Sequence, residues 1–184
     1  MLLRTICTLS AAGLAAAAAG VMNADACNRS DTNQLWLLNS THGSATHQLT
    51  VRAAAADADA DTDAAEERCA ALVVKGCAVD DFSFVSTAAC APADCAEAQA
   101  FDVLESATKL PAPAGAACAS CVVRSRLNTS LCFGVGAELG GVKWKVSAPT
   151  AAGEQTLEMI GAHLCLTSGF ETSPYPISLQ ECEY

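Results

Sequence analysis

Short alternations of apolar and polar residues, separated by turn residues, run through the chain from residue 27 onward. Val142-Lys143-Trp144-Lys145-Val146 alternates throughout, and Ile177-Ser178-Leu179 does the same. Alternation with a period of two places every second side chain on one face of a β-strand. Gly140-Gly141 and residues 149–153 supply turns between such segments. The pattern predicts an all-β domain of short strands.

Two kinds of sequence mark recur along the chain and indicate an internal repeat. A Gln two residues before an apolar residue occurs as Gln34-Leu35-Trp36, Gln99-Ala100-Phe101 and Gln155-Thr156-Leu157. A Cys beside an apolar residue occurs as Cys69-Ala70, Cys132-Phe133 and Cys165-Leu166. An alternating or apolar segment follows each Cys. Three copies of one Cys-marked unit predict a repeated β-architecture.

The repeat also implies that the two ends of the domain meet. The third copy ends at Cys182, where a further Gln segment is expected, and residues 27–38 supply that segment at the start. A closed barrel leaves no free edge strands. We therefore expect the N-terminal strand to pair near the C-terminus and complete the third repeat. Trp36, Phe101 and Leu157 are then expected in corresponding places.

Residues 27–184 resemble the ricin-B type lectin family, in which a Gln-x-Trp mark closes each repeat. Gln34-Leu35-Trp36 has the full mark, whereas Phe101 and Leu157 replace Trp in the other copies. The resemblance implies a β-trefoil of three Cys-marked, disulfide-stapled repeats. It also implies a secreted carbohydrate-binding role.

The first 26 residues have the composition of a secretory signal peptide. Arg4 precedes an apolar run rich in Ala and Leu, and Ala24-Asp25-Ala26 forms an A-x-A cleavage site. The alternative is an uncleaved signal anchor, because residues 5–22 approach the length that spans a bilayer. Cleavage predicts a secreted, extracellular or vacuolar protein. Three glycosylation sequons, at Asn28, Asn39 and Asn128, agree with this route.

The chain contains 11 cysteines, and removal of Cys7 with the leader leaves an even set that predicts up to five disulfides. The family resemblance implies Cys69–Cys90 and Cys165–Cys182 and leaves Cys132 to pair elsewhere. Cys118-Ala119-Ser120-Cys121 is open to three interpretations: a redox dithiol, half of a zinc site or a structural disulfide. Without a βαβ context or a second C-x-x-C, a structural disulfide is favoured.

Two segments interrupt the repeats. Residues 53–67 are acidic and Ala-rich and hold no bulky apolar side chain, which predicts an insertion or a nascent helix. Their Asp spacing lacks the Gly and distal Glu of an EF-hand loop, so we expect no metal ion. Residues 110–119 contain Pro111, Pro113 and Gly115 and are predicted to form neither a helix nor an inner strand.

Sugar-binding lectins of this family stack an aromatic ring on the sugar and hydrogen-bond it with an Asp after the repeat Cys and an Asn before the Gln. Transferred onto this chain, the Asp position holds Ala71, Gly134 or Thr167, and none of the three copies keeps the acid. In the first copy Ala98 also replaces Asn. The resemblance leaves five candidate sugar-binding residues: Trp144 and Glu154 in the second copy, and Asn33, Thr167 and Tyr175 in the third.

Trp144 has a second interpretation as a core residue, because Val142 and Val146 share its face of the predicted strand. Its position therefore discriminates between two functions. One is a lectin-like module that binds glycans or glycoproteins. The alternative is a disulfide-stapled trefoil scaffold that binds a protein, which the two insertions favour by remodelling loops.

The net charge of −10 excludes neither function but argues against nucleic acid and anionic membrane surfaces as partners. His42, His47 and His163 accompany no nucleophile motif, and no pair of catalytic carboxylates can be identified. We therefore expect no enzymatic activity, no cofactor and no membrane association after leader cleavage.

Overall fold

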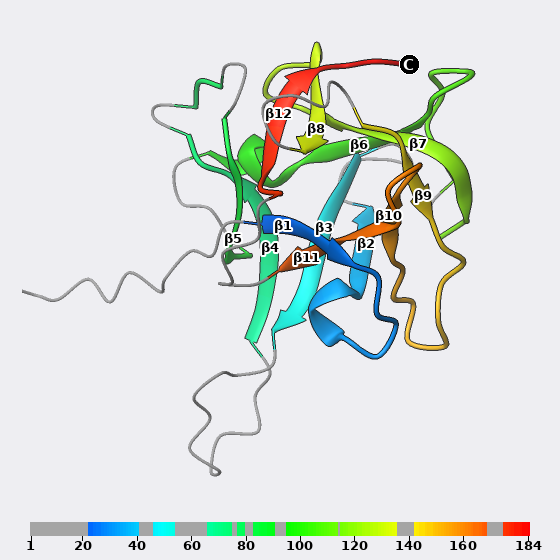
Figure 1. The fold of residues 1–184 in the computed structure, drawn as a ribbon. Helices are drawn as coiled ribbons and strands as arrows, with labels where there is room; N and C mark the ends of the chain where they lie inside the picture. The colour runs from blue at the N-terminus through cyan, green and yellow to red at the C-terminus, as the bar shows by residue number, and fades with distance from the viewer. Residues whose placement is uncertain are drawn as a thin grey trace, which may run out of the picture.

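The regular structure of the described residues is almost all β-strand (Figure 1). The computed structural model describes residues 22–40, 46–53, 66–74, 77–79, 83–90, 95–113, 115–135, 142–168 and 175–184. Within these residues there are twelve strands in one sheet, together with the short 3-10 helices η1 (Thr32–Gln34) and η2 (Ala96–Gln99). The strands are β1 (Met22–Ala26), β2 (Trp36–Ser40), β3 (Thr46–Ala53), β4 (Glu66–Leu72), β5 (Val85–Ala89), β6 (Phe101–Glu105), β7 (Cys118–Ser125), β8 (Leu131–Val135), β9 (Trp144–Val146), β10 (Leu157–Met159), β11 (Leu164–Ser168) and β12 (Ile177–Glu181). The predicted all-β class is confirmed.

Half of these strands form a ring. Antiparallel pairing links β2, β3, β6, β7, β9 and β10 in that order. The ring closes just before β10, where Trp36 and Gln155 exchange two backbone hydrogen bonds of 2.8 Å. The ring is a nearly closed, barrel-like sheet, so most of its backbone groups are paired.

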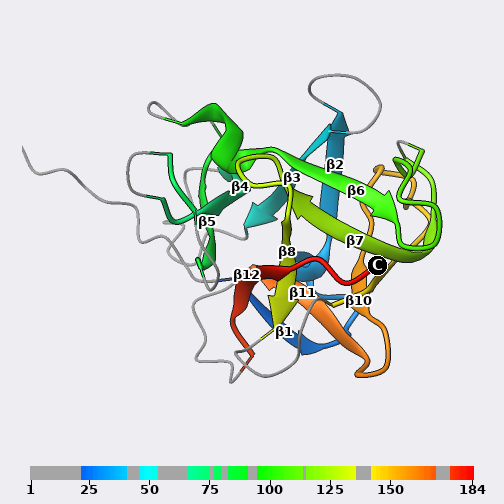
Figure 2. The same ribbon diagram turned by 90° about the horizontal axis from the view of Figure 1, so that it is seen from above.

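The remaining described strands form three antiparallel outer pairs: β4 with β5, β8 with β12, and β11 with β1. Each pair joins the ring through one member, because β4 pairs with β3, β8 with β7 and β11 with β10. Backbone bridges from Phe84 to Ser178 and from Asn23 to Pro176 connect the pairs to one another. Figure 2 shows β8 and β12 side by side, far apart though they are in the sequence.

Each outer pair and the two ring strands beside it make a four-stranded unit. The first unit is β3, β4, β5 and β6, which follow one another in the chain. The second unit is β7, β8, β12 and β9, and the third is β10, β11, β1 and β2. The C-terminal strand therefore completes the second unit, and the N-terminal strand completes the third.

The strand that pairs near the C-terminus is β1, which lies upstream of the expected segment 27–38 and corrects its predicted bounds. β1 pairs with β11 over five residues, from Met22 opposite Ser168 to Ala26 opposite Leu164 (Figure 1). This strand lies inside residues 1–26, which the sequence predicts as a leader. Its Met22 and Ala24 side chains are 0% exposed. Met22 and Ala24, within the predicted leader, thus contribute to the core.

In the second unit the residue that corresponds to Trp36 and Phe101 is not the predicted one. Trp36, Phe101 and Trp144 begin the ring strands β2, β6 and β9 of the three units, and all are 0% exposed. Leu157 lies on β10, a different position of the unit, so it does not correspond to Trp36 and Phe101. The prediction failed because Gln155-Thr156-Leu157 has the Gln-x-apolar pattern by sequence but lies elsewhere in the unit. In the second unit Val142, two residues before Trp144, replaces the Gln.

Gln34 and Gln99 do occupy corresponding places. The Gln34 side chain donates a 3.0 Å hydrogen bond to the carbonyl of Ala26, the residue before Cys27. The Gln99 side chain donates a 2.7 Å bond to the carbonyl of Ala89, the residue before Cys90. Gln155 instead donates to the carbonyls of Ala116 and Ser147. The Gln34 and Gln99 side chains therefore each hydrogen-bond the end of an outer strand, directly before its disulfide-bonded cysteine.

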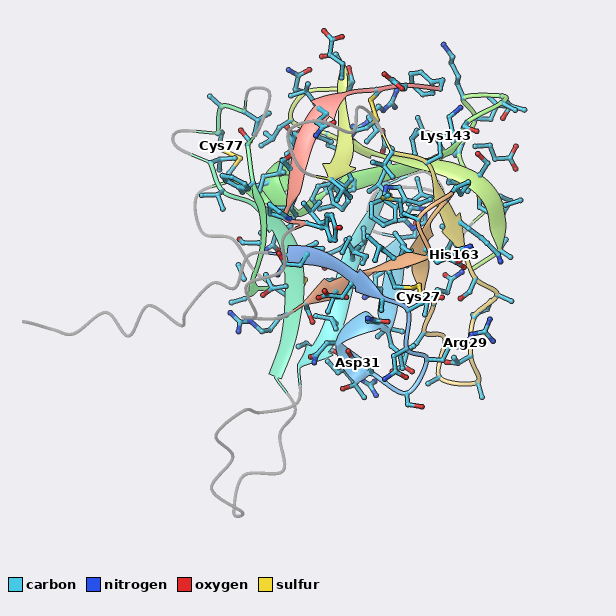
Figure 3. The ribbon with its side chains drawn as sticks, viewed as in Figure 1. Cys27, Arg29, Asp31, Cys77, Lys143 and His163 are labelled. Carbon is cyan, nitrogen blue, oxygen red and sulfur yellow. A yellow bond between two sulfur atoms is a disulfide. The ribbon has the colours of Figure 1, made fainter. Side chains whose placement is uncertain are left out.

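Disulfides join the strands of each outer pair. Cys69–Cys90 links β4 to the end of β5, as the family resemblance implies. The implied Cys165–Cys182 bond is wrong, because β12 pairs with β8 and β1 takes its place beside β11. Cys182 is bonded to Cys132, and Cys165 to Cys27, whose side chain is labelled in Figure 3.

The three bonds have the same geometry relative to the sheet. Cys69, Cys132 and Cys165 stand opposite Ala88, Gln180 and Asp25. In each case the bonded cysteine follows that partner by two residues. The described residues also contain the bonds Cys77–Cys95 and Cys118–Cys121, so the C-x-x-C pair is a disulfide.

The two predicted insertions differ in what the structure describes of them. Residues 54–65, most of the acidic segment, lie outside the described residues, and strands β3 and β4 extend into its two ends. The segment predicted at 110–119 folds against the ring, with Ala112 4% exposed and Pro111 bridged to Leu104. Its last two residues, Cys118 and Ala119, already belong to β7, which corrects the predicted boundary.

The Cys27–Cys165 bond is expected to contribute far more stability than Cys118–Cys121. The bonded residues are 138 positions apart in the first case and 3 in the second. Loop-closure entropy in the unfolded chain predicts a loss of about 5 kcal/mol for a Cys27→Ala/Cys165→Ala double variant and about 2 kcal/mol for Cys118→Ala/Cys121→Ala. Urea unfolding measures both losses. Equal losses in the two variants would contradict the expected order.

Candidate functional site

Trp144, the predicted sugar-stacking residue, lies in the core and not at the surface. It is 0% exposed on β9, between Cys121 of β7 and Met159 of β10. Its indole N–H has no hydrogen-bond partner among the described residues. Stacking on a pyranose requires an accessible ring face. The proposed stacking role of Trp144 is therefore wrong, and its alternative interpretation as a core residue is right.

The three positions near the repeat cysteines that were expected to contact the sugar are also inaccessible. Ala71 and Thr167 are each 7% exposed, and the Thr167 hydroxyl donates a 3.0 Å bond to the carbonyl of Cys165. At Gly134 an added Cβ would collide with the Gln180 side chain. Gln180 thus fills the space that a side chain at position 134 would need.

Hydrogen bonds of main-chain atoms fix the backbone at Glu154 and at Asn33. The Thr150 amide donates to the Glu154 carbonyl at 2.8 Å, and the Glu154 side chain is half-buried. Asn33 lies in η1, where its amide donates to the Asp31 carboxylate at 2.9 Å. Its carbonyl accepts a 3.2 Å bond from the Ser168 hydroxyl. Asn33 therefore adjoins the end of β11.

Tyr175 is the one candidate with a well-exposed aromatic ring, at 42%. Its carbonyl accepts a 2.9 Å hydrogen bond from the Ala24 amide of β1. Thr167 pairs with Asn23 of the same strand. The third unit thus brings Asn33, Thr167 and Tyr175 to the region around β1 and β11.

The three sequons differ in their surroundings. Asn28 is exposed, and its side-chain oxygen accepts a 3.0 Å bond from the Ser30 amide. The Asn128 oxygen accepts bonds from both the amide and the hydroxyl of Ser130, at 3.1 and 2.7 Å. Asn39 lies on β2 and donates its amide to the Thr50 hydroxyl at 3.2 Å. Asn28 and Asn128 therefore lie in turns, and Asn39 lies in a paired strand.

Asp102 is a buried acid that the sequence analysis did not identify. It is 1% exposed on β6 and lies 2.7 Å from the Arg124 guanidinium and 3.6 Å from that of Arg126. The Thr46 hydroxyl donates to its second oxygen at 3.0 Å. Both carboxylate oxygens are therefore occupied, and the group acts as a structural ion pair between β3, β6 and β7.

His47 is the second buried polar group that the sequence did not reveal. Its ring is 1% exposed and hydrogen-bonds the Leu38 backbone, and its Nδ1 has no partner among the described residues. A cavity of about 10 Å³ lies beside it, under Ala112, Pro113 and Ala116. That volume holds roughly one water molecule and is far below the size of a ligand pocket.

The connection between β6 and β7, residues 106–117, presents the most exposed large apolar side chain of the described residues, Leu110 at 63%. The Lys109 amide donates to the Glu105 carbonyl at 2.8 Å, and the Glu105 amide donates to the Leu110 carbonyl at 2.9 Å. Lys109 adopts a φ of 59° at this turn. Backbone hydrogen bonds therefore hold Leu110 in a defined position.

Further contacts fix both sides of this connection. The Lys109 ammonium lies 4.3 Å from the centre of the Tyr184 ring. The Ala112 amide donates to the Val103 carbonyl at 2.9 Å, and the Gln155 side chain donates to the Ala116 carbonyl at 3.1 Å. The sequence marked residues 110–119 as a loop. The sequence analysis missed Leu110, although its position between Lys109 and Pro111 could have indicated an exposed apolar residue.

No family model, curated protein or solved structure matches the chain. Among the described residues, no group of three or more His, Cys, Asp or Glu side chains is placed to hold a metal ion. The described part of the chain also contains no helix with the length and apolar character needed to cross a membrane.

Stability is expected to fall as the pH drops below 6.5, the ordinary pKa of His. Burial is the main effect on His47, and it lowers the pKa of the ring below 6.5. The hydrogen bond with the Leu38 backbone and the negative charge of Asp102 both raise this pKa, and each is a smaller effect than burial. The unfolded chain therefore binds a proton that the folded chain does not, and this stability is complete above pH 6.5 and lost below it.

Thermal unfolding midpoints at pH 7.5 and 5.5 measure this effect. His47→Gln is expected to reduce the difference between the two midpoints, because Gln cannot titrate. His163→Gln is a control at an exposed ring and should leave the contribution of His47 in place. An unchanged difference in His47→Gln would contradict the assignment.

Proposed function

We propose that the chain is a secreted, disulfide-stapled β-trefoil scaffold that binds a protein partner through the connection at residues 106–117. The trefoil is supported by the ring of six strands with three outer pairs and by three disulfides of equal offset. The corresponding roles of Gln34 and Gln99 support a distant relation to ricin-B type lectins. Disulfides of this number support a secreted location.

The burial of Trp144 is the main observation that favours a protein partner over a sugar. A lectin pocket needs an exposed aromatic face with polar groups around it, and the second unit has its aromatic ring inside the barrel. In the same unit Gln180 covers the position of the family's Asp. The role proposed is one of binding and not of catalysis.

Leu110 is the residue proposed to enter a pocket on the partner. Its side chain is exposed while its backbone is held on both sides, so little conformational entropy is lost on binding. Burial of a leucine contributes roughly 1.5–3 kcal/mol. The acidity of the chain favours a protein surface over nucleic acid or an anionic membrane.

Glycan binding is the second candidate function. It is favoured by Tyr175, whose ring is 42% exposed near Asn33 and Thr167 of the third unit. A glycan array with the wild-type protein and Tyr175→Ala tests it. Binding that disappears in Tyr175→Ala would favour a lectin-like role over the scaffold.

Site-specific photo-crosslinking tests the role of Leu110. A photoreactive leucine analogue at position 110, exposed to extracellular fluid of the source organism, is expected to form a discrete adduct. The same analogue at Ile160, which is 47% exposed, is the matched control. Excess wild-type protein should abolish the adduct, and Leu110→Asp should compete at least about tenfold less well. Equal competition by Leu110→Asp, or no adduct from position 110, would contradict the proposal.

A further inference from the structure

The strand β1 lies within the segment whose sequence predicts a secretory leader. Its residues pair with β11 from Met22 to Ala26, and the Ala24 amide also donates to the Tyr175 carbonyl at 2.9 Å. Asn23 forms a backbone bridge to Pro176. β1 therefore lies between β11 and the start of β12 and holds them together.

The side chains of β1 belong to the main hydrophobic core. Met22 and Ala24 are 0% exposed and pack in the cluster that includes Leu166, Ile177 and Leu179. Without β1, β11 would lose its partner on one side and these apolar side chains would lose their cover. Apolar area exposed in this way lowers stability by about 25 cal/mol per Å².

β1 also has the same role as two strands that lie well inside the chain. β5 and β12 each pair with a Cys-bearing strand and lead to its bonded cysteine, Cys90 or Cys182. β1 pairs with β11 and leads to Cys27. A domain that began at Cys27 would keep the disulfide and lack the strand that the other two units have.

We propose that the leader is cut upstream of Met22, so that β1 is the first strand of the mature protein. The inference rests on the secreted location proposed above. Small residues three positions and one position before the cut are the requirement of a leader peptidase, and Ala17-Ala18-Ala19 and Ala18-Ala19-Gly20 both meet it. The mature chain then begins at Gly20 or Val21.

The reaction is hydrolysis of one peptide bond. The C–N bond after Ala19 or Gly20 breaks, water supplies the hydroxyl to the new carboxyl group, and its proton goes to the new amine of the mature chain. The peptidase acts before folding, so burial does not shield the bond after Ala26. The reason for the upstream cut is that the folded domain needs the strand between the two sites.

The mature N-terminus is measured directly on the full chain. The precursor is expressed in a eukaryotic secretory host, and the protein from the medium is deglycosylated and analysed by intact mass and N-terminal sequencing. A start at Gly20 or Val21 is expected. A start at Cys27 would overturn the inference while leaving secretion intact, and a chain that stays in the cell with Met1 would overturn both.

Substitutions in the full precursor give a second readout. If β1 is retained, Met22→Ala leaves a cavity and lowers the thermal midpoint of the secreted protein by roughly 5–15 °C. Met22→Asp places a carboxylate in the core and should reduce the secreted yield as well. Asp25→Asn is the matched control, because this side chain of the same strand is partly exposed. If the cut follows Ala26, all three mature proteins are identical to wild type in sequence and in midpoint, which would refute the inference.

Discussion

The structure depends on the pairing of the N-terminal residues with the last third of the chain. β1 pairs with β11, Trp36 exchanges backbone hydrogen bonds with Gln155, and Cys27 is bonded to Cys165. These contacts close the ring and complete the third unit. Because a ring of strands leaves few unpaired backbone groups, this closure allows a chain with few aromatic residues to bury a sheet of short strands.

The order of the strands in space differs from their order in the chain. β12 completes the second unit and not the third, and β1 takes the place beside β11. The three outer pairs nevertheless keep one geometry, in which each repeat cysteine bonds to a residue two positions beyond its partner in register. Pairing geometry, and not chain order, makes the units equivalent.

Sequence alone predicted the features that depend on local pattern. Alternation identified β9 and β12 but not β1, which the sequence assigned to the leader. The resemblance implied Cys69–Cys90 correctly, because β4 and β5 are consecutive and pair with each other. Cys165 and Cys182 are also close in sequence, yet their strands β11 and β12 pair with β1 and β8 and not with each other. No local pattern specifies which strand pairs with β12, because its partner β8 is distant in the sequence.

The candidate site was less predictable than the fold. Alternation placed Val142, Trp144 and Val146 on one face of a strand, but which face meets the core depends on β7 and β10. The buried groups His47 and Asp102 are single residues in ordinary strand sequence. Only the packing around them distinguishes them from surface residues. The sequence likewise does not indicate why residue 134 is Gly, because the Gln180 side chain that fills the adjacent space comes from β12.

The proposed scaffold places a closed, disulfide-linked body behind a connection that holds Leu110 outward. That arrangement requires the outer pairs to be joined as the structure has them. Peptide mapping of the unreduced protein by mass spectrometry tests this most directly. The account predicts peptides that link Cys27 to Cys165 and Cys132 to Cys182. A peptide that links Cys165 to Cys182 would contradict it.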